Sequence, residues 1–210
     1  MSHLLRKRHA SMSTETREQY LDDIGAESDR LRRLTEDLLV LSRAEGGQLV
    51  VAMHPIAMKH VVDAVVASQR ARGTGHAFVL DADAELPIVQ GEEVYVEQVI
   101  RNFLGNAVKY SPAGTTITIS VASGSAGVEV RITDEGAGLP EGEPDRLFEL
   151  FYRAKGAVAT TSGAGIGLFV CRELVHAMGG RVWARPGSAG SGAEFGFWLP
   201  AATWVDGDDA

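Results

Sequence analysis

Two neighbouring segments with alternating apolar residues limit most strongly how this chain can fold. Residues 115–122 and 127–134 each turn every second side chain to one face, and a short Ser/Gly-rich sequence joins them. The apolar positions are Ile117, Ile119, Val121, Val128, Val130 and Ile132. This alternation predicts two β-strands of an antiparallel hairpin that bury one face. Such a sheet needs a second layer to cover its apolar face.

Segments with helical periodicity can supply that layer. The expected elements are helices over 58–72, 91–110, 145–152 and 164–178, and strands over 76–83, 181–185 and 193–199. This order, with mostly antiparallel strands, predicts an α+β fold in the form of a two-layer α/β sandwich. A doubly wound parallel sheet would need single strands that alternate with helices, a pattern this chain lacks.

A long helix is expected before this domain, over residues 15–44. Its leucines recur at intervals of three or four residues or their sums, and charged residues fill the other positions. Ser13 or Thr14 can cap its start, and the glycines at 46 and 47 can end it. Such a narrow apolar stripe needs a partner helix, from this chain or from another subunit. We therefore expect a helical segment 1–47, an α/β domain 48–200 and an acidic tail 201–210, with 49–55 as an extended connector.

Composition excludes several classes of protein. The 210 residues carry a net charge of −8, which disfavours binding to nucleic acid or to an anionic membrane. The single cysteine, Cys171, can form neither an intramolecular disulfide nor a site with several thiolates, which favours a reducing, cytoplasmic compartment. No apolar run is long enough to span a membrane.

The expected helix 91–110 carries two asparagines four residues apart. Asn102 and Asn106 then share one face, close to Lys109. Paired carboxamide oxygens beside an ammonium group suit a hydrated divalent cation and the phosphates that it bridges. A solvated polar face is the alternative interpretation of this pair.

The sequence DEGAGLP follows the second strand of the hairpin. Asp134 at a strand end can accept a hydrogen bond from an exocyclic amine, and Gly136 and Gly138 let the backbone approach a flat ligand. The same spacing also occurs in ordinary turns. Further along, we expect Phe148 and Phe151 to pack in the interior and to hinge the adjoining loop.

A run of alternating glycines, Gly163, Gly165 and Gly167, opens into the expected helix 164–178. Backbone N–H groups at such a helix start form an anion site. A Walker-type P-loop is excluded because no Lys-Ser/Thr follows, and a dinucleotide fingerprint is disfavoured because no strand precedes the run within a βαβ unit.

In order and spacing, these motifs resemble the catalytic, ATP-binding domain of bacterial sensor histidine kinases, which has the Bergerat fold. The segments that carry the resemblance are EQVIRNFLGNAVKYSP, DEGAGLP, LFELFYRA and GAGIGL. It runs over roughly residues 56–200. The preceding ESDRLRRLTEDLLVLSRAEGG resembles the second helix of the family's dimerisation and phosphoacceptor domain.

The resemblance implies roles for particular residues. Asn106 is the implied Mg²⁺ ligand, Asp134 the reader of the adenine amine, and residues 153–162 a mobile lid over ATP. The implied ATP-binding residues are Asn102, Asn106, Lys109, Tyr110, Asp134, Gly136, Gly138, Phe151, Arg153, Gly163, Gly165, Ile166, Gly167 and Leu168. The γ-phosphoryl group of Mg-ATP would pass to a histidine and then to a response regulator, and the full-length protein would be a homodimer.

The histidine that accepts phosphate in this family precedes an acidic residue and then a hydrophobic-Arg-x-Pro sequence. None of the six histidines has this context, and His3 is only a weak candidate. We therefore expect the chain to lack its own phosphoacceptor. The alternative function is a regulatory nucleotide-binding module or an anti-sigma-type serine kinase of the same fold. A Bergerat-fold ATPase is disfavoured because Asn102 stands where those enzymes carry a water-activating Glu.

Overall fold

The computed structural model describes residues 13–139, 144–152, 165–187 and 192–203. The chain divides into two compact units, Met1–Gly46 and Gly47–Ala210, which are described separately.

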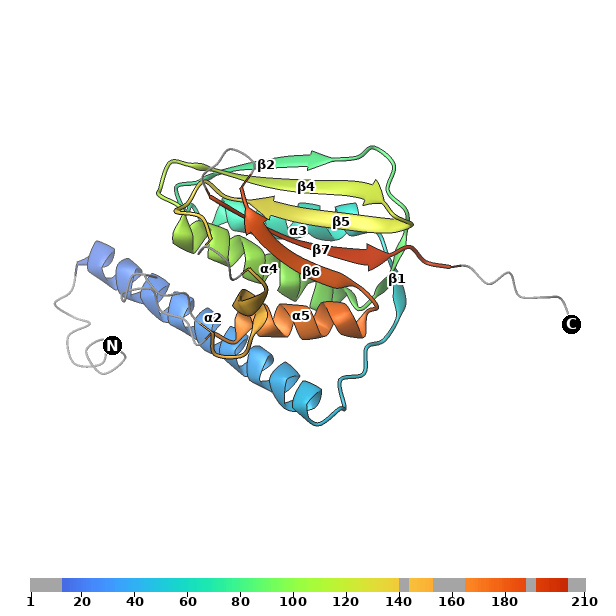
Figure 1. The fold of residues 1–210 in the computed structure, drawn as a ribbon. Coiled ribbons are helices and arrows are strands. Elements are labelled where there is room, and N and C mark those ends of the chain that lie inside the picture. The colour runs from blue at the N-terminus through green and yellow to red at the C-terminus, as the bar shows by residue number, and fades with distance from the viewer. Residues whose placement is uncertain (1–12, 140–143, 153–164, 188–191, 204–210) are drawn as a thin grey trace, which may run out of the picture. The chain divides into compact units, whose positions relative to one another are not determined.

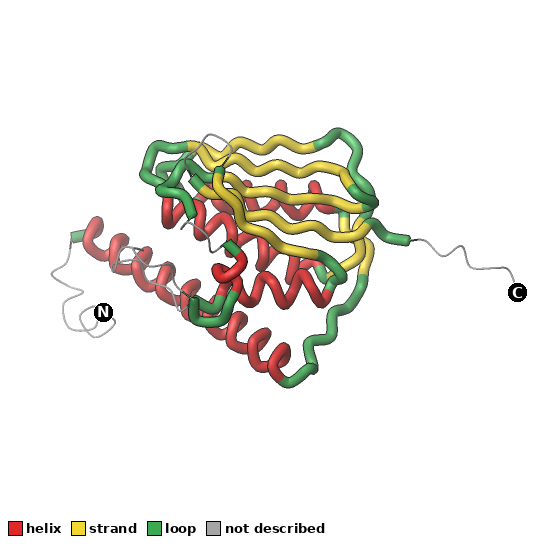
Figure 2. Tube along the Cα trace, in the orientation of Figure 1, coloured by secondary structure: helices red, strands yellow, loops and turns green. Residues whose placement is uncertain are grey.

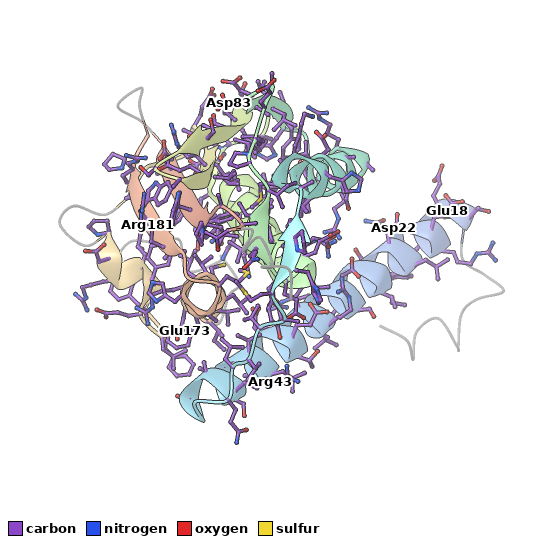
Figure 3. All side chains as sticks on the ribbon, turned by 90° about the vertical axis from the view of Figure 1, so that its right-hand side faces the viewer. Glu18, Asp22, Arg43, Asp83, Glu173 and Arg181 are labelled. Atoms are coloured by element: carbon purple, nitrogen blue, oxygen red, sulfur yellow. The ribbon has the colours of Figure 1, made fainter. Side chains whose placement is uncertain are left out.

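The first unit contains the long helix α2, Thr14–Glu45. The side chain of Ser13 caps it by accepting a hydrogen bond from the Thr16 N–H at 3.2 Å. Charged side chains such as Glu18 and Asp22 project from the helix into solvent (Figure 3). Leu21 and Leu31 are more than half exposed. The predicted helix is thus confirmed.

The second unit has two layers, a five-stranded sheet and a set of helices that covers one of its faces (Figures 1 and 2). The strand order is β2-β4-β5-β7-β6, with only β2 and β4 parallel. The strands are β2 Ala77–Ala82, β4 Thr116–Gly124, β5 Gly127–Thr133, β6 Arg181–Pro186 and β7 Ala193–Pro200. The helices are α3 Met58–Ala71, α4 Glu93–Tyr110 and α5 Gly167–Ala177. This architecture confirms the predicted two-layer α/β sandwich.

The predicted hairpin is also confirmed. β4 and β5 pair antiparallel, and Ser125 and Ala126 form the turn with φ angles of +46° and +57°. Positive φ at both central residues is typical of the two-residue turns whose twist matches that of the strands.

Two short strands were not predicted. β1, His54–Ile56, pairs antiparallel with β3, Val89–Gly91, and forms a separate small sheet. The connector expected over 49–55 therefore ends inside a strand, and the helix expected from residue 91 begins at Glu93. Strands of three residues are too short to show a period of two, so their pairing depends on tertiary context.

The helix expected over 145–152 was wrong in extent. A 3₁₀-helix, η1, covers Asp145–Phe148, and the Glu149 backbone is already extended. The last expected helix begins at Gly167 in place of residue 164, which lies outside the described residues.

The core lies between α4 and the sheet. Phe103 of α4 is fully buried, and its ring centroid lies 5.7 Å from that of Phe195 and 6.4 Å from that of Phe197, both on β7. Val96, Val99, Ile100, Leu104 and Ala107 extend the same buried stripe of α4.

None of the helices in the described ranges combines the length and apolar character needed to cross a membrane.

Phe103→Ala should lower the free energy of unfolding by about 3–5 kcal/mol, because it leaves a cavity between helix and sheet. Phe151, which is 64% exposed, provides the matched control. Phe151→Ala removes the same ring and should cost less than about 1 kcal/mol. Urea unfolding followed by circular dichroism measures both, and equal losses would contradict the assigned core.

Candidate functional site

Asp134 is a buried carboxylate directly after β5, with 4% of its surface exposed. Its Oδ1 accepts hydrogen bonds from the N–H of Gly136 at 2.8 Å and from the N–H of Ala193 at 3.2 Å. The Asp134 N–H in turn donates to the Ala193 carbonyl at 2.9 Å. Both side-chain hydrogen bonds converge on one oxygen, and within the described ranges no donor contacts Oδ2. Oδ2 is therefore available to a donor from a ligand.

Burial raises the pKa of Asp134 above its ordinary value of 3.8, and the hydrogen bonds from Gly136 and Ala193 partly oppose that rise. Loss of water around the charged form is the dominant cause. A carboxylate in this state gains most from a ligand that supplies a hydrogen-bond donor.

Gly136 brings the loop after β5 against the end of α4. A Cβ at this position would lie 2.5 Å from the carbonyl oxygen of Tyr110 and 2.8 Å from Oδ1 of Asp134. Any side chain here would displace either the helix end or the carboxylate. The close approach explains why the sequence has glycine two residues after the aspartate.

Gly192 packs against the backbone of Asp134. It has a φ of +81°, and a Cβ there would overlap the carbonyl oxygen of Asp134. Gly192 and Ala193 were missing from the predicted site, because the sequence places them only at the junction between the expected strands 181–185 and 193–199. The signal that could have found them is the density of glycines in a hairpin whose second strand lies beside β5.

The two asparagines of α4 lie on its polar face, each partly exposed. Asn102 meets the start of α5, since a Cβ on Gly167 would lie 2.7 Å from Asn102 Oδ1. Lys109 stacks its ammonium group 4.8 Å from the ring centroid of Tyr110, at the end of the same helix. The polar face of α4 therefore runs from the start of α5 to the loop that holds Asp134.

The start of α5 presents backbone donors. Its N-cap residue, Ile166, has an apolar side chain that cannot accept a hydrogen bond, so it does not cap the first N–H groups of the helix. Ile166 itself is buried, whereas Leu168 is partly exposed. Such a helix start can bind an anion.

The two phenylalanines before this helix behave differently. Phe148 is buried and meets Phe195 edge to face, as predicted. The expectation that Phe151 packs inside was wrong, because its backbone has a φ of +61° and its ring is 64% exposed. The Phe151 N–H donates to the Gly165 carbonyl at 3.0 Å, and a Cβ on Gly165 would lie 3.1 Å from the Phe151 backbone. This close backbone contact forces the chain to turn and directs the ring outward.

The structure therefore brings most of the predicted residues together through contacts between motifs. Asn102 meets Gly167, Tyr110 meets Gly136, and Phe151 meets Gly165. Gly138 approaches Gly192, whose carbonyl oxygen would lie 3.3 Å from a Cβ on Gly138. His3, Arg153 and Gly163, together with the expected lid, lie outside the described residues.

The described ranges hold no group of three His, Cys, Asp or Glu side chains that could bind a metal. Asn106 offers one carboxamide oxygen, and Mg²⁺ commonly takes one or two protein ligands together with waters and substrate phosphates. The donor set therefore fits a metal that arrives with a phosphate ligand. Among the described histidines, His54, His60 and His176 are exposed and the ring of His76 contacts the Thr74 carbonyl, and none belongs to such a group.

Comparison with known proteins points to one family. The sequence model described as "Histidine kinase-, DNA gyrase B-, and HSP90-like ATPase" matches residues 91–203. The sensor-like histidine kinase SenX3 of Mycobacterium tuberculosis is 28% identical over 200 residues, which are 93% of this chain and 48% of that protein. The adaptive-response sensory kinase SasA of Synechocystis sp. is 34% identical over 173 residues, which are 80% of this chain and 44% of that protein.

One solved structure is also similar to this chain over most of its length. The match to full-length ShkA in complex with AMPPNP covers 94% of this chain and 41% of the ShkA chain, with a TM-score of 0.70 and 28% identity. The chain spans about half the length of the curated relatives that it matches.

The raised pKa of Asp134 predicts a pH dependence of stability. Between pH 3.8 and its raised native pKa, the native state keeps a proton that the unfolded chain has lost. The free energy of unfolding of the wild type should therefore fall with rising pH over this interval. Asp134→Asn does not titrate, so its stability relative to the wild type should rise over the same interval and then level off.

Urea unfolding at a series of pH values tests this, with Asp83→Asn as the control. Asp83 also accepts a backbone N–H, from Ser123 at 2.8 Å, but it is exposed. If the free energy of unfolding of Asp134→Asn differs from that of the wild type by the same amount at every pH, burial does not raise the pKa of Asp134.

Proposed function

Because the chain belongs to the family of histidine kinase-, DNA gyrase B- and HSP90-like ATPases, we propose that residues 47–203 bind ATP as the catalytic region of a sensor histidine kinase. In this function, the γ-phosphoryl group of ATP passes to a histidine imidazole. The likeness to sensor kinases over most of this chain supports histidine as the acceptor and disfavours the alternative of a serine kinase or a purely regulatory module.

The observation that carries the proposal is the unused Oδ2 of Asp134. This oxygen belongs to a buried carboxylate and accepts no hydrogen bond from the described residues. The exocyclic amine of adenine is a neutral donor of matching chemistry, and it would satisfy the carboxylate without burying a second charge. Gly136 and Gly138 add no side chains to the loop that follows the carboxylate. The match to a structure solved with AMPPNP, an analogue of ATP, supports ATP as the ligand of this domain.

The phosphates would lie between α4 and the start of α5. The backbone donors of α5 and the ammonium group of Lys109 would neutralise their charge, and Asn102 would hold the two helices together at Gly167. Asn106 would hold Mg²⁺ together with the phosphates. When bound, Mg²⁺ supplies charge neutralisation across the phosphate oxygens.

The transfer of the phosphoryl group requires little acid–base catalysis by the protein. A nitrogen of the acceptor imidazole forms a bond to the γ-phosphorus, while the bond from this phosphorus to the β–γ bridging oxygen breaks and ADP leaves. Catalysis of this kind depends on positioning and charge stabilisation. The helix start, Lys109 and the two asparagines supply these functions.

The partners belong to the same proposal. α2 would be the second helix of the dimerisation and phosphoacceptor domain, and its exposed leucines would pack in a homodimer of the full-length protein. The phosphohistidine would then pass its phosphoryl group to an aspartate of a response regulator.

Discrimination between ATP and GTP tests the role of Asp134. ATP should bind more tightly than GTP, because GTP presents a carbonyl oxygen where ATP has the amine. Asp134→Asn should weaken ATP binding roughly tenfold to hundredfold, the loss of one charge-assisted hydrogen bond, and should reduce the preference over GTP. Isothermal titration calorimetry with Mg²⁺ present measures both nucleotides.

Glu135→Gln is the matched control for that experiment, because it removes one negative charge from the next residue. Glu135 is exposed, and its carboxylate accepts the Thr116 N–H at 3.4 Å. Its nucleotide affinities should stay within about twofold of wild type, since exposed charges contribute little. Unchanged ATP affinity in Asp134→Asn would contradict the proposal that Asp134 binds the adenine amine.

Radiolabelled ATP tests where the phosphoryl group goes. Incubation of the chain with Mg²⁺ and ATP labelled at the γ-phosphate should give bound nucleotide but no acid-labile label on the protein, because no histidine has the expected sequence context. Acid-labile label on the chain would show that one of its own histidines is the acceptor, and His3→Gln would then be the first variant to examine.

A further inference from the structure

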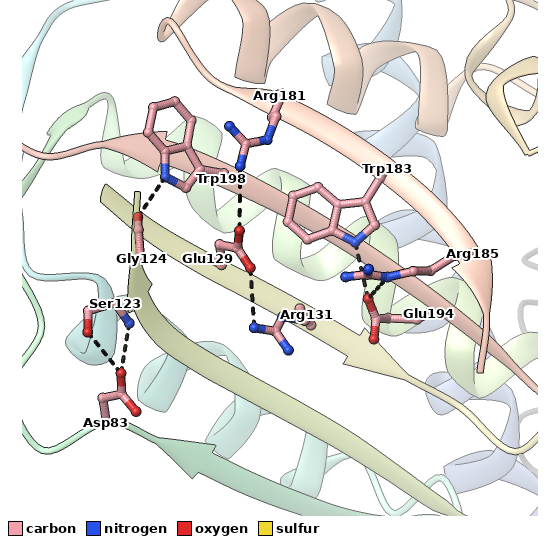
Figure 4. A network of polar contacts seen from close by, with 10 residues as sticks. All are labelled: Asp83, Ser123, Gly124, Glu129, Arg131, Arg181, Trp183, Arg185, Glu194 and Trp198. Atoms are coloured by element: carbon pink, nitrogen blue, oxygen red, sulfur yellow. Dashed lines mark hydrogen bonds and ion pairs between the residues drawn. The ribbon is translucent and has the colours of Figure 1, made fainter. Parts of the chain in front are cut away.

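The sheet face opposite the helices carries a cluster of aromatic and charged side chains, shown in Figure 4. These residues lie on β5, β6 and β7, and we call them the tryptophan–arginine face. Its members are Glu129, Arg131, Arg181, Trp183, Arg185, Glu194 and Trp198. The candidate nucleotide-binding residues Asn102 and Asn106 lie on α4, in the layer that covers the other face of the sheet.

Glycines beneath the indole rings let both tryptophans lie against the sheet. A Cβ on Gly196 would lie 2.3 Å from the indole of Trp183, and a Cβ on Gly127 would lie 2.5 Å from the indole of Trp198. The Trp183 indole N–H donates to Glu194 at 3.1 Å, and that of Trp198 donates to a carbonyl of β4 at 3.2 Å. Both rings are thus fixed in position and in orientation.

An arginine side chain stacks on each indole ring. The guanidinium of Arg181 lies 4.7 Å from the ring centroid of Trp198, and that of Arg185 lies 5.5 Å from the ring centroid of Trp183. The arginine side chains are nevertheless 53% and 54% exposed. Stacking on a fixed ring holds a guanidinium in place while it still faces solvent, which lowers the entropy cost of binding a partner.

Two glutamates form ion pairs with the three arginines. Glu129 pairs with Arg131 at 3.2 Å and with Arg181 at 3.5 Å, and Glu194 pairs with Arg185 at 2.6 Å. Each guanidinium has five N–H donors, so these contacts, the ones recorded within the described ranges, occupy a minority of them. The Nε–H of Arg131 is buried and has no acceptor within those ranges.

A shallow hollow of about 260 Å³ lies on this face. Glu129, Arg181, Val182, Trp183 and Arg185 line it. It lies at the edge strand β6, and Val182 and Trp183 supply its apolar lining. Arg181, Trp183 and Arg185 alternate along β6, so they project from the same side of the strand.

We propose that the tryptophan–arginine face binds an acidic, extended segment of a partner protein. The argument is charge complementarity: three arginines and two glutamates leave this face one net positive charge and unused guanidinium donors, on a chain whose net charge is −8. Arg181 and Arg185 are four residues apart on one strand, which is about 13 Å. Two carboxylates four residues apart in an extended segment match that spacing, and the residue midway between them faces the hollow. Tryptophan and arginine are also the residues that dominate binding energy at protein interfaces.

A defined peptide tests this surface. The probe is fluorescein-labelled Ser-Glu-Ser-Leu-Ser-Glu-Ser, titrated with the full chain at low and at physiological salt and followed by fluorescence anisotropy. We expect saturable binding that weakens with salt. Arg181→Gln combined with Arg185→Gln should weaken it roughly tenfold or more, because a few central residues carry most interface energy. ATP affinity should not change.

The matched control is Lys59→Gln combined with Arg101→Gln. It also removes two positive charges and two ion pairs, but from α3 and α4. Its peptide affinity should stay within about twofold of wild type. Arg181→Lys combined with Arg185→Lys keeps both charges, so it covers the case in which the glutamine pair does not fold. It should still weaken binding about threefold or more, because lysine lacks the planar fork.

Three results would overturn the proposal. The first is the absence of saturable binding. The second is equal binding of the probe and of its analogue with lysine in place of glutamate. The third is a rise in peptide affinity of about fivefold or more after deletion of residues 204–210, which include three aspartates. That last result would assign the face to the chain's own acidic residues.

Discussion

The packing of α4 against the sheet is the constraint on which the rest of the second unit depends. One stripe of this helix, centred on the fully buried Phe103, fills the space beneath β7. Because the helix repeats every 3.6 residues, the same packing fixes the direction of the adjacent, partly exposed stripe, which carries Asn102 and Asn106. The core and the candidate phosphate site are therefore two faces of one rigid element. A change that rotates α4 would disturb both.

Close backbone approach is the second organising feature. Asp134 receives its hydrogen bonds from the backbone, and Gly136, Gly167 and Gly192 each lie where a side chain would collide with a neighbouring part of the site. A site held by backbone groups depends on the fold more than on the chemistry of individual side chains. It also leaves one oxygen of a buried carboxylate without a donor from the described residues, and the assignment of adenine rests on that oxygen.

The sequence was sufficient to predict the elements with a clear period and the motifs with local spacing. The alternation in 115–122 and 127–134 predicted the hairpin, and the apolar stripe of 91–110 predicted α4 with its asparagines on the polar face. Features set by contacts between distant residues were not predictable. The pairing of β1 with β3 and the hydrogen bonds between Asp134 and Ala193 join segments far apart in the chain. The outward ring of Phe151 follows from its backbone contact with Gly165. Local propensity does not predict a contact between residues that lie this far apart in the chain.

The single parallel pair in the sheet has a consequence for the order of folding. β4 and β5 are joined by a two-residue turn, so their pairing closes a very short loop. β2 reaches β4 only after the chain has passed through β3 and α4, and the entropy cost of closing that longer loop must be met first. Local contacts form faster than distant ones. The hairpin can therefore act as the template on which β2 is added late, and the edge of the sheet next to α3 is then the part expected to open first in the native state.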